Sequence, residues 1–121
     1  MLSDFYIIMN EHIGQDCAEF DVLLNPDCKV YKGHFPGEPV SPGVCSIQMV
    51  KECAEKMAGA RLCFVQIKQC RFQQLLSPAT TPELKIEISL KQEEDNLNAE
   101  AKVMCNEVIC VSLKGTLKKE A

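Results

Sequence analysis

The sequence lacks long apolar runs and clusters of basic residues. No apolar stretch approaches the roughly 20 residues that a membrane-spanning helix needs, so we predict no membrane span. The 13 basic residues against 17 acidic ones give a net charge of −4, and no basic run extends beyond Lys118-Lys119. A nucleic-acid-binding surface needs concentrated positive charge, so we predict no nucleic-acid partner. The N-terminal segment has no basic start followed by a small-residue cleavage site, which favours a cytoplasmic protein.

Cysteine is abundant, but its spacing lacks a metal-binding pattern. The chain has eight cysteines, and none of them forms a Cys-x-x-Cys pair. Structural zinc sites use closely spaced cysteine and histidine pairs, so we predict no metal site. Several cysteines fall inside apolar stretches, which indicates small buried side chains in a reducing compartment. A secreted protein with disulfide bonds is the alternative.

The length suits one domain with its own core, which we predict over residues 1–121. One helix is predicted over residues 43–58. Ser41 is a good N-cap, Pro42 suits the first helical position, and Gly59 is a natural stop. Apolar residues cover much of the circumference of this helix, which predicts that it is buried.

The rest of the chain predicts strands, because apolar and polar residues alternate there or form short apolar runs. The predicted strands cover residues 5–9, 19–24, 62–72, 83–91, 97–105 and 108–117. Asn106-Glu107 is a candidate two-residue hairpin turn, since asparagine tolerates a positive φ. We expect His12 to be exposed in a loop before Gly14. The fold class is therefore α+β, an antiparallel sheet of about six strands wrapped around one long central helix.

Residues 33–43 are the most informative stretch. They read Gly-His-Phe-Pro-Gly-Glu-Pro-Val-Ser-Pro-Gly and hold three of the six prolines and three of the six glycines. Proline fixes φ and glycine admits conformations that other residues avoid, so this loop can hold its histidine in place. Histidine has an unperturbed pKa of about 6.5 and exchanges a proton near neutral pH. The pattern therefore indicates proton chemistry at His34.

This stretch resembles the signature of the beta-hydroxyacyl-ACP dehydratases of bacterial fatty-acid synthesis, G-H-F-P-G-x-P-x-x-P-G-V. The matching residues are Gly33, His34, Phe35, Pro36, Gly37, Pro39, Pro42, Gly43 and Val44. The resemblance implies a hotdog fold, in which the long helix lies inside the curved sheet. It also implies a homodimer whose sheets join edge to edge, with active sites at the dimer interface. Trimers of dimers are common in the family.

The resemblance assigns roles to residues around the start of the helix. His34 would be the base that removes the C2 proton of a 3-hydroxyacyl thioester. The backbone N–H groups of Gly43 and Val44 would polarise the thioester carbonyl, because the first turn of a helix has unpaired donors. Tyr31 and Phe35 would flank the site and pack on the substrate or on the partner subunit. The reaction would need no metal and no organic cofactor.

The chain departs from the family at the acid. Family members place Glu or Asp fourteen residues after the histidine, where this sequence has Gln48. An amide cannot donate a proton as a carboxylic acid does, although it can hydrogen-bond a hydroxyl or hold a water. Many family members carry Glu at this position and Gln one helical turn later. This sequence has the two residues exchanged, with Gln48 first and Glu52 one turn further. One hypothesis is that Glu52 would supply the acid, directly or through Gln48 or water. The other is that His34 would give the proton it takes from C2 to the departing hydroxyl. Alternatively, Glu52 is a solvated or interface residue paired with Lys51, Lys56 or a basic residue of a partner subunit. Gln48 is then a substrate-binding or structural amide in a site that has lost dehydration.

Three functions follow. The leading one is dehydration of a 3-hydroxyacyl chain on acyl carrier protein to the trans-2-enoyl thioester. The main rival is a catalytically weakened acyl-thioester binding subunit that partners a competent dehydratase, and a hotdog thioesterase ranks last. Acyl carrier protein would be an acidic partner, for which Lys29, Lys32, Lys68 and Arg71 are candidate docking residues. Ordinary surface charge is the alternative for these four.

Overall fold

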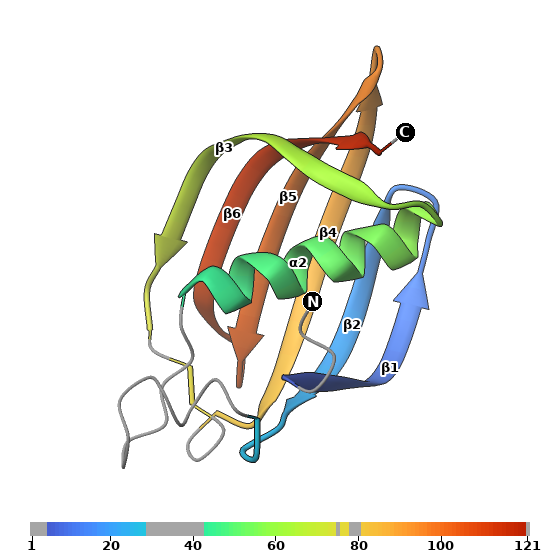
Figure 1. The fold of residues 1–121 in the computed structure, drawn as a ribbon. Coiled ribbons are helices and arrows are strands. Elements are labelled where there is room, and N and C mark those ends of the chain that lie inside the picture. The colour runs from blue at the N-terminus through green and yellow to red at the C-terminus, as the bar shows by residue number, and fades with distance from the viewer. Residues whose placement is uncertain (1–4, 29–42, 75, 78–80, 121) are drawn as a thin grey trace.

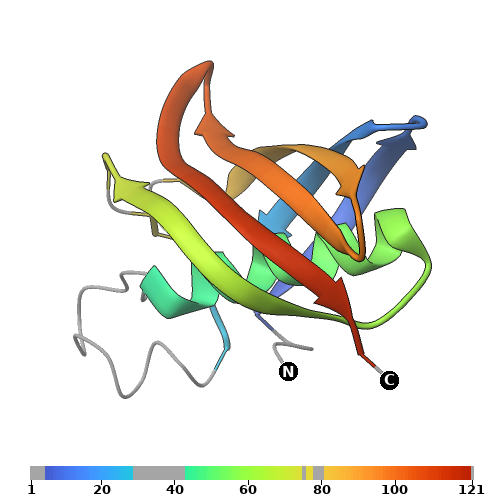
Figure 2. The same ribbon diagram turned by 90° about the horizontal axis from the view of Figure 1, so that it is seen from above.

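The computed structural model describes residues 5–28, 43–74, 76–77 and 81–120. This part of the chain forms a curved sheet with one helix across its concave face, as Figure 1 shows. Figure 2 shows the sheet curling over the helix. The elements are β1 (Tyr6–Ile13), β2 (Cys17–Leu24), α2 (Gly43–Ala58), β3 (Leu62–Phe72), β4 (Glu83–Glu93), β5 (Asn96–Cys105) and β6 (Val108–Lys119).

The sheet has six strands in the order β1-β2-β4-β5-β6-β3, and every neighbouring pair is antiparallel. The predicted architecture, an antiparallel sheet around a central helix, is therefore confirmed. Strands β1 and β3 are the two edges. The sequence order does not reveal that β3 pairs with β6, because these strands are far apart in the chain.

The helix α2 has the predicted bounds, residues 43–58. Its C-terminal end is capped by Gly59, which has a φ of 68° and donates its N–H to the Glu55 carbonyl over 2.8 Å. The predicted cap and first residue, Ser41 and Pro42, lie outside the described residues. The buried face of α2 consists of Cys45, Ser46, Met49, Val50, Cys53 and Ala54. In the described part of the chain, no helix has the length and apolarity to cross a membrane.

The core lies between α2 and the inward side chains of the sheet. Its largest fully buried side chains are Phe5, Phe20, Leu24, Met49, Leu62, Ile86, Ile88, Leu113 and Leu117. All eight cysteines are free thiols. Five of them are buried, at positions 28, 45, 53, 105 and 110, as expected for small apolar side chains.

Two strand details refine the sequence interpretation. The first strand extends to Ile13, so His12 is exposed on β1, and its predicted loop position is wrong. The pairing of β1 with β2 shifts in register between Ile8 and Asn10 and then continues beyond the apolar run of residues 5–9. The Asn106-Glu107 hairpin is confirmed, because both residues have positive φ, 49° and 68°, between β5 and β6.

Candidate active site

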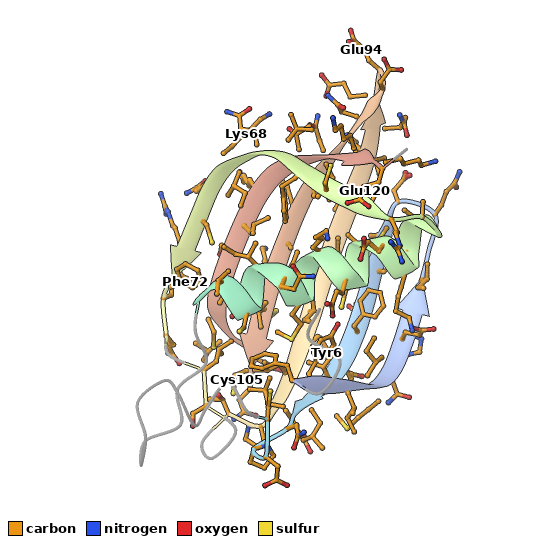
Figure 3. All side chains as sticks on the ribbon, viewed as in Figure 1. Tyr6, Lys68, Phe72, Glu94, Cys105 and Glu120 are labelled. Carbon is orange, nitrogen blue, oxygen red and sulfur yellow. The ribbon has the colours of Figure 1, made fainter. Side chains whose placement is uncertain are left out.

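The first turn of α2 carries the donors that the site needs. The N–H groups of Gly43 and Val44 precede the first intrahelical hydrogen bond, so they point away from the helix without an intrahelical partner. The Phe72 ring, at the end of β3, lies against Gly43. A Cβ atom on this glycine would be 2.9 Å from the Phe72 Cζ. Figure 3 shows Phe72 at this end of the helix. The Val44 side chain is 70% exposed and Phe72 is 52% exposed, so apolar surface borders the helix start.

One turn further, a hydrogen-bonded array joins α2 to β1. The Gln48 Nε2 donates to Glu52 Oε2 over 3.1 Å. The Tyr6 hydroxyl donates to Glu52 Oε1 over 2.8 Å. Both carboxylate oxygens of Glu52 therefore accept a hydrogen bond. Figure 3 shows Tyr6 near the middle of α2.

Burial shapes the electrostatics around this array. Burial, the Cys53 thiol beside the ring and the hydrogen bond to Glu52 raise the pKa of Tyr6 above its usual range. Burial and the neighbouring Glu52 carboxylate raise the pKa of the Cys53 thiol to about 12. Tyr6 and Cys53 therefore stay protonated at neutral pH. Tyr6 acts there as a hydrogen-bond donor to Glu52.

The lysines on α2 have acidic partners other than Glu52. Lys51 Nζ lies 3.9 Å from Glu55 Oε2, and Lys56 Nζ lies 3.4 Å from Glu11 Oε2 on β1. Glu55 also accepts the Leu62 backbone N–H over 2.9 Å, which ties the end of α2 to the start of β3. The pairing of Lys51 or Lys56 with Glu52, considered from the sequence, is thus not the arrangement that the structure shows.

The structure describes four of the predicted site residues and places them on one helix. Gly43, Val44, Gln48 and Glu52 all lie on α2 within its first three turns. The predicted base His34 and the flanking Tyr31 and Phe35 lie outside the described residues, as do Lys29 and Lys32.

The two remaining docking candidates, Lys68 and Arg71, are exposed on the edge strand β3. Arg71 lines a groove together with outward-facing residues such as Glu87 and Glu100. Glu87 and Glu100 alternate with buried residues along β4 and β5, so this groove is on the sheet face turned away from α2. In the parts of the chain that are described, no group of three His, Cys, Asp or Glu side chains is placed to hold a metal ion.

The sequence analysis singled out neither Tyr6 nor Phe72 as a site residue. Tyr6 stands in an apolar run, where a tyrosine reads as another core residue, and its partner Glu52 is 46 positions away. The hydroxyl of a buried tyrosine usually has a polar partner, and this was the available signal. Phe72 contacts Gly43 only because β3 returns across the start of α2.

The chain is similar in sequence to known dehydratases. The model of the ApeI-like family, described as ApeI dehydratase, matches residues 10–112. A 3-hydroxyacyl-acyl-carrier-protein dehydratase FabZ from Lactiplantibacillus plantarum is 31% identical over 74 residues, which are 55% of this chain and 49% of the relative. The FabZ of Lactobacillus helveticus is 31% identical over 92 residues, 70% of this chain and 57% of the relative. The chain thus spans about half the length of these relatives.

Solved structures share the fold. A chain of the dehydratase heterocomplex ApeI:P from Xenorhabdus doucetiae superposes with a TM-score of 0.76 at 23% identity, covering 93% of this chain and 97% of that one. The protein PH1136 from Pyrococcus horikoshii superposes with a TM-score of 0.71 at 12% identity, covering 97% of this chain and 84% of that one. These likenesses confirm the predicted hotdog fold.

Proposed function

Because the chain belongs to the ApeI-like dehydratase family, we propose that it eliminates water from a 3-hydroxyacyl thioester to give the trans-2-enoyl thioester. The observation that carries the proposal is the Gly33-His34-Phe35-Pro36-Gly37 sequence, followed at the right distance by a helix that begins at Gly43. The FabZ relatives act on 3-hydroxyacyl chains held by acyl carrier protein, and we propose the same substrate class here.

In the proposed reaction, His34 takes the C2 proton and becomes an imidazolium. The N–H groups of Gly43 and Val44 stabilise the negative charge that develops on the thioester oxygen. The C3–O bond then breaks, a C2–C3 double bond forms, and the hydroxyl leaves with a proton as water. Tyr31 and Phe35 are proposed to pack on the acyl chain. The reaction needs no metal and no organic cofactor.

The leaving hydroxyl needs a proton, and two groups are candidate donors. Both carboxylate oxygens of Glu52 are engaged as hydrogen-bond acceptors, one by Tyr6 and the other by Gln48. This supports the route in which His34 returns its own proton to the hydroxyl while Gln48 hydrogen-bonds that hydroxyl. The route through Glu52, directly or by way of Gln48 or a water, remains a prediction. The Glu52→Gln variant tests it, since unchanged turnover would eliminate Glu52 as the acid.

The test is turnover of a 3-hydroxyacyl-ACP by the purified protein, followed by the absorbance of the enoyl product. We expect measurable turnover in the native protein and its loss in His34→Ala. The matched control is His12→Ala, because the other histidine is exposed on β1 and should be dispensable. Gln48→Glu should raise turnover by about 100-fold or more, the usual worth of a general acid. A carboxyl group there would face the Glu52 carboxylate one turn away, and like charges that close favour retention of a proton.

A second function is favoured by Gln48 itself. A binding subunit that has lost dehydration would show no turnover as the native protein and would gain it in Gln48→Glu. A thioesterase would instead hydrolyse the thioester, which frees the 3-hydroxy acid and leaves a free thiol on acyl carrier protein, without an enoyl product. Loss of turnover in His12→Ala together with retention in His34→Ala would contradict the proposed dehydratase site.

The proposed partners follow from the substrate. We propose acyl carrier protein as the acidic partner, and a homodimer, with trimers of dimers as a larger assembly, in the cytoplasm. Reversing the charge of exposed Lys68 and Arg71 should weaken turnover with a carrier-bound substrate but spare a short soluble thioester. Equal loss on both substrates would count against docking at these residues.

A further inference from the structure

The hydroxyl of Tyr6 lies at the end of the array that reaches Gln48. Tyr6 is the first residue of β1, and its side chain is almost fully buried. The ring packs edge-to-face against Phe5, with centroids 6.4 Å apart and an interplanar angle of 74°. This packing holds the ring against α2 and leaves the hydroxyl on Glu52 Oε1, 2.8 Å away.

The other carboxylate oxygen of Glu52 determines how the Gln48 amide is turned. With Nε2 donating over 3.1 Å, the Gln48 carbonyl oxygen faces away from the carboxylate. The reverse orientation would place two acceptor oxygens against each other, which is unfavourable. One N–H of the amide is used on Glu52, and the second N–H and the carbonyl oxygen remain for other partners.

We infer that Tyr6 is a positioning residue: its hydroxyl fixes the Glu52 carboxylate, which in turn fixes the Gln48 amide that meets the leaving hydroxyl of the substrate. The inference rests on the proposed dehydratase function for its catalytic part. A positioning role for Tyr6 also explains how this chain accommodates Gln48 and Glu52 in place of the family's Glu and Gln. The exchange moves the negative charge one turn along α2, into a half-buried place, and a half-buried carboxylate needs strong donors. Tyr6 and Gln48 supply one each.

Tyr6 does not need to give up its proton in this role. Burial raises the pKa of Tyr6, so the hydroxyl remains a donor across the pH range in which the enzyme would work. The neighbouring Cys53 thiol is likewise protonated. The hydrogen bonds of the array therefore orient the Gln48 amide without a proton transfer from Tyr6.

The experiment removes the hydroxyl in two backgrounds. Tyr6→Phe keeps the ring and its packing on Phe5. The second background is the exchange Gln48→Glu with Glu52→Gln, which restores the family order and places an amide opposite Tyr6. In the native background we expect Tyr6→Phe to lower kcat about tenfold with KM within about twofold, because an orienting contact rather than substrate binding is lost. In the exchanged background we expect a change of less than about twofold, since a neutral amide has less need of the donor.

A measurement independent of turnover accompanies the kinetics. The side-chain amide resonance of Gln48 reports its hydrogen bond to the carboxylate, and we expect it to shift or broaden in Tyr6→Phe. The matched control is Thr116→Val on β6. It also removes a buried hydroxyl, but this hydroxyl donates over 3.3 Å to Asn98 Oδ1 on β5 and not to a residue of α2. Thr116→Val should leave the Gln48 resonance and kcat unchanged.

The outcomes separate this inference from the proposed function. A shifted Gln48 resonance, together with a loss of kcat confined to the native background, supports the inference. An unmoved resonance in Tyr6→Phe overturns it, whatever the turnover. A shifted resonance in a protein without turnover refutes the dehydratase function and the catalytic part of the inference, and leaves the structural array supported.

Discussion

The first residue of α2 lies against an aromatic ring. A methyl group on Gly43 would be 2.9 Å from the Cζ and 3.1 Å from the Cε1 of Phe72. Real Cβ atoms do not approach carbon this closely, so the ring position requires a glycine. Because the proposed oxyanion donors are the N–H groups of this same turn, we expect the ring to shield them from solvent on one side.

We therefore predict that Gly43→Ala impairs turnover more than stability. Phe72 is half exposed and can turn toward solvent, so the free energy of unfolding should change by less than about 1 kcal/mol. Displacement of the ring should lower kcat about tenfold, because water then reaches the oxyanion donors. The double variant Gly43→Ala with Phe72→Ala separates the clash from the loss of the ring. Urea unfolding and enoyl absorbance measure the two effects. A loss of several kcal/mol with full turnover per folded molecule would contradict this account.

At the same scale, the sequence predicted the residues of the motif but not their partners. Gly43, Val44, Gln48 and Glu52 are close in sequence, so helical spacing alone places them along one element. Tyr6 and Phe72 come from distant strands, and their contacts depend on how the sheet curves around the helix. Long-range side-chain partners of this kind carry no local sequence signal.

Among the elements, those with local signals were predicted well. The helix bounds followed from apolar spacing and a stop glycine, and the hairpin after β5 followed from an asparagine that tolerates positive φ. The end of β1 was missed because Asn10, Glu11 and His12 are consecutive polar residues on an edge strand. Edge strands have exposed faces, so the alternation that marks a strand is weak there. The irregular pairing of β3 with β6 was also not predictable, since it is set by backbone contacts.

One of those contacts gives a prediction for the β3–β6 pair. A Cβ atom on Gly115 would be 2.8 Å from the backbone carbonyl oxygen of Gln66, where the register of β3 shifts between Phe64 and Gln66. Backbone cannot swing away as a side chain can. Gly115→Ala should therefore lower the free energy of unfolding by about 2 to 3 kcal/mol, the upper part of the usual overpacking cost.

Chemical denaturation measures this change, with Lys114→Ala as the control. Lys114 is exposed on the same strand and pairs with exposed Glu100 at 4.0 Å, a contact of little worth. If Gly115→Ala were as stable as Lys114→Ala, β3 would have to be able to separate from β6 at the register shift. The close packing of these two strands would then not be required by the fold.

For the whole molecule, the two edge strands of the sheet are the candidates for the dimer interface. Both carry exposed apolar side chains: Val65 and Ile67 on β3, and Ile7 and Met9 on β1. Unpaired edges of this kind favour pairing with another chain. Exposure alone does not choose between them. The proposed edge-to-edge dimer needs a long strand that also reaches the active site, and β3 is such a strand because Phe72, at its end, contacts Gly43.

We predict that Ile67→Lys disrupts the dimer and that Ile7→Lys does not. Both residues are exposed on edge strands, at 40% and 57%, so either charge is tolerated in the folded monomer. Light scattering coupled to size exclusion measures the mass. If the interface also completes the active site, Ile67→Lys should lose turnover along with the dimer and regain both at high protein concentration. A dimer that survives Ile67→Lys but dissociates in Ile7→Lys would assign the interface to β1. Phe72 would then lie far from the partner, and the proposed site would have to be built within a single chain.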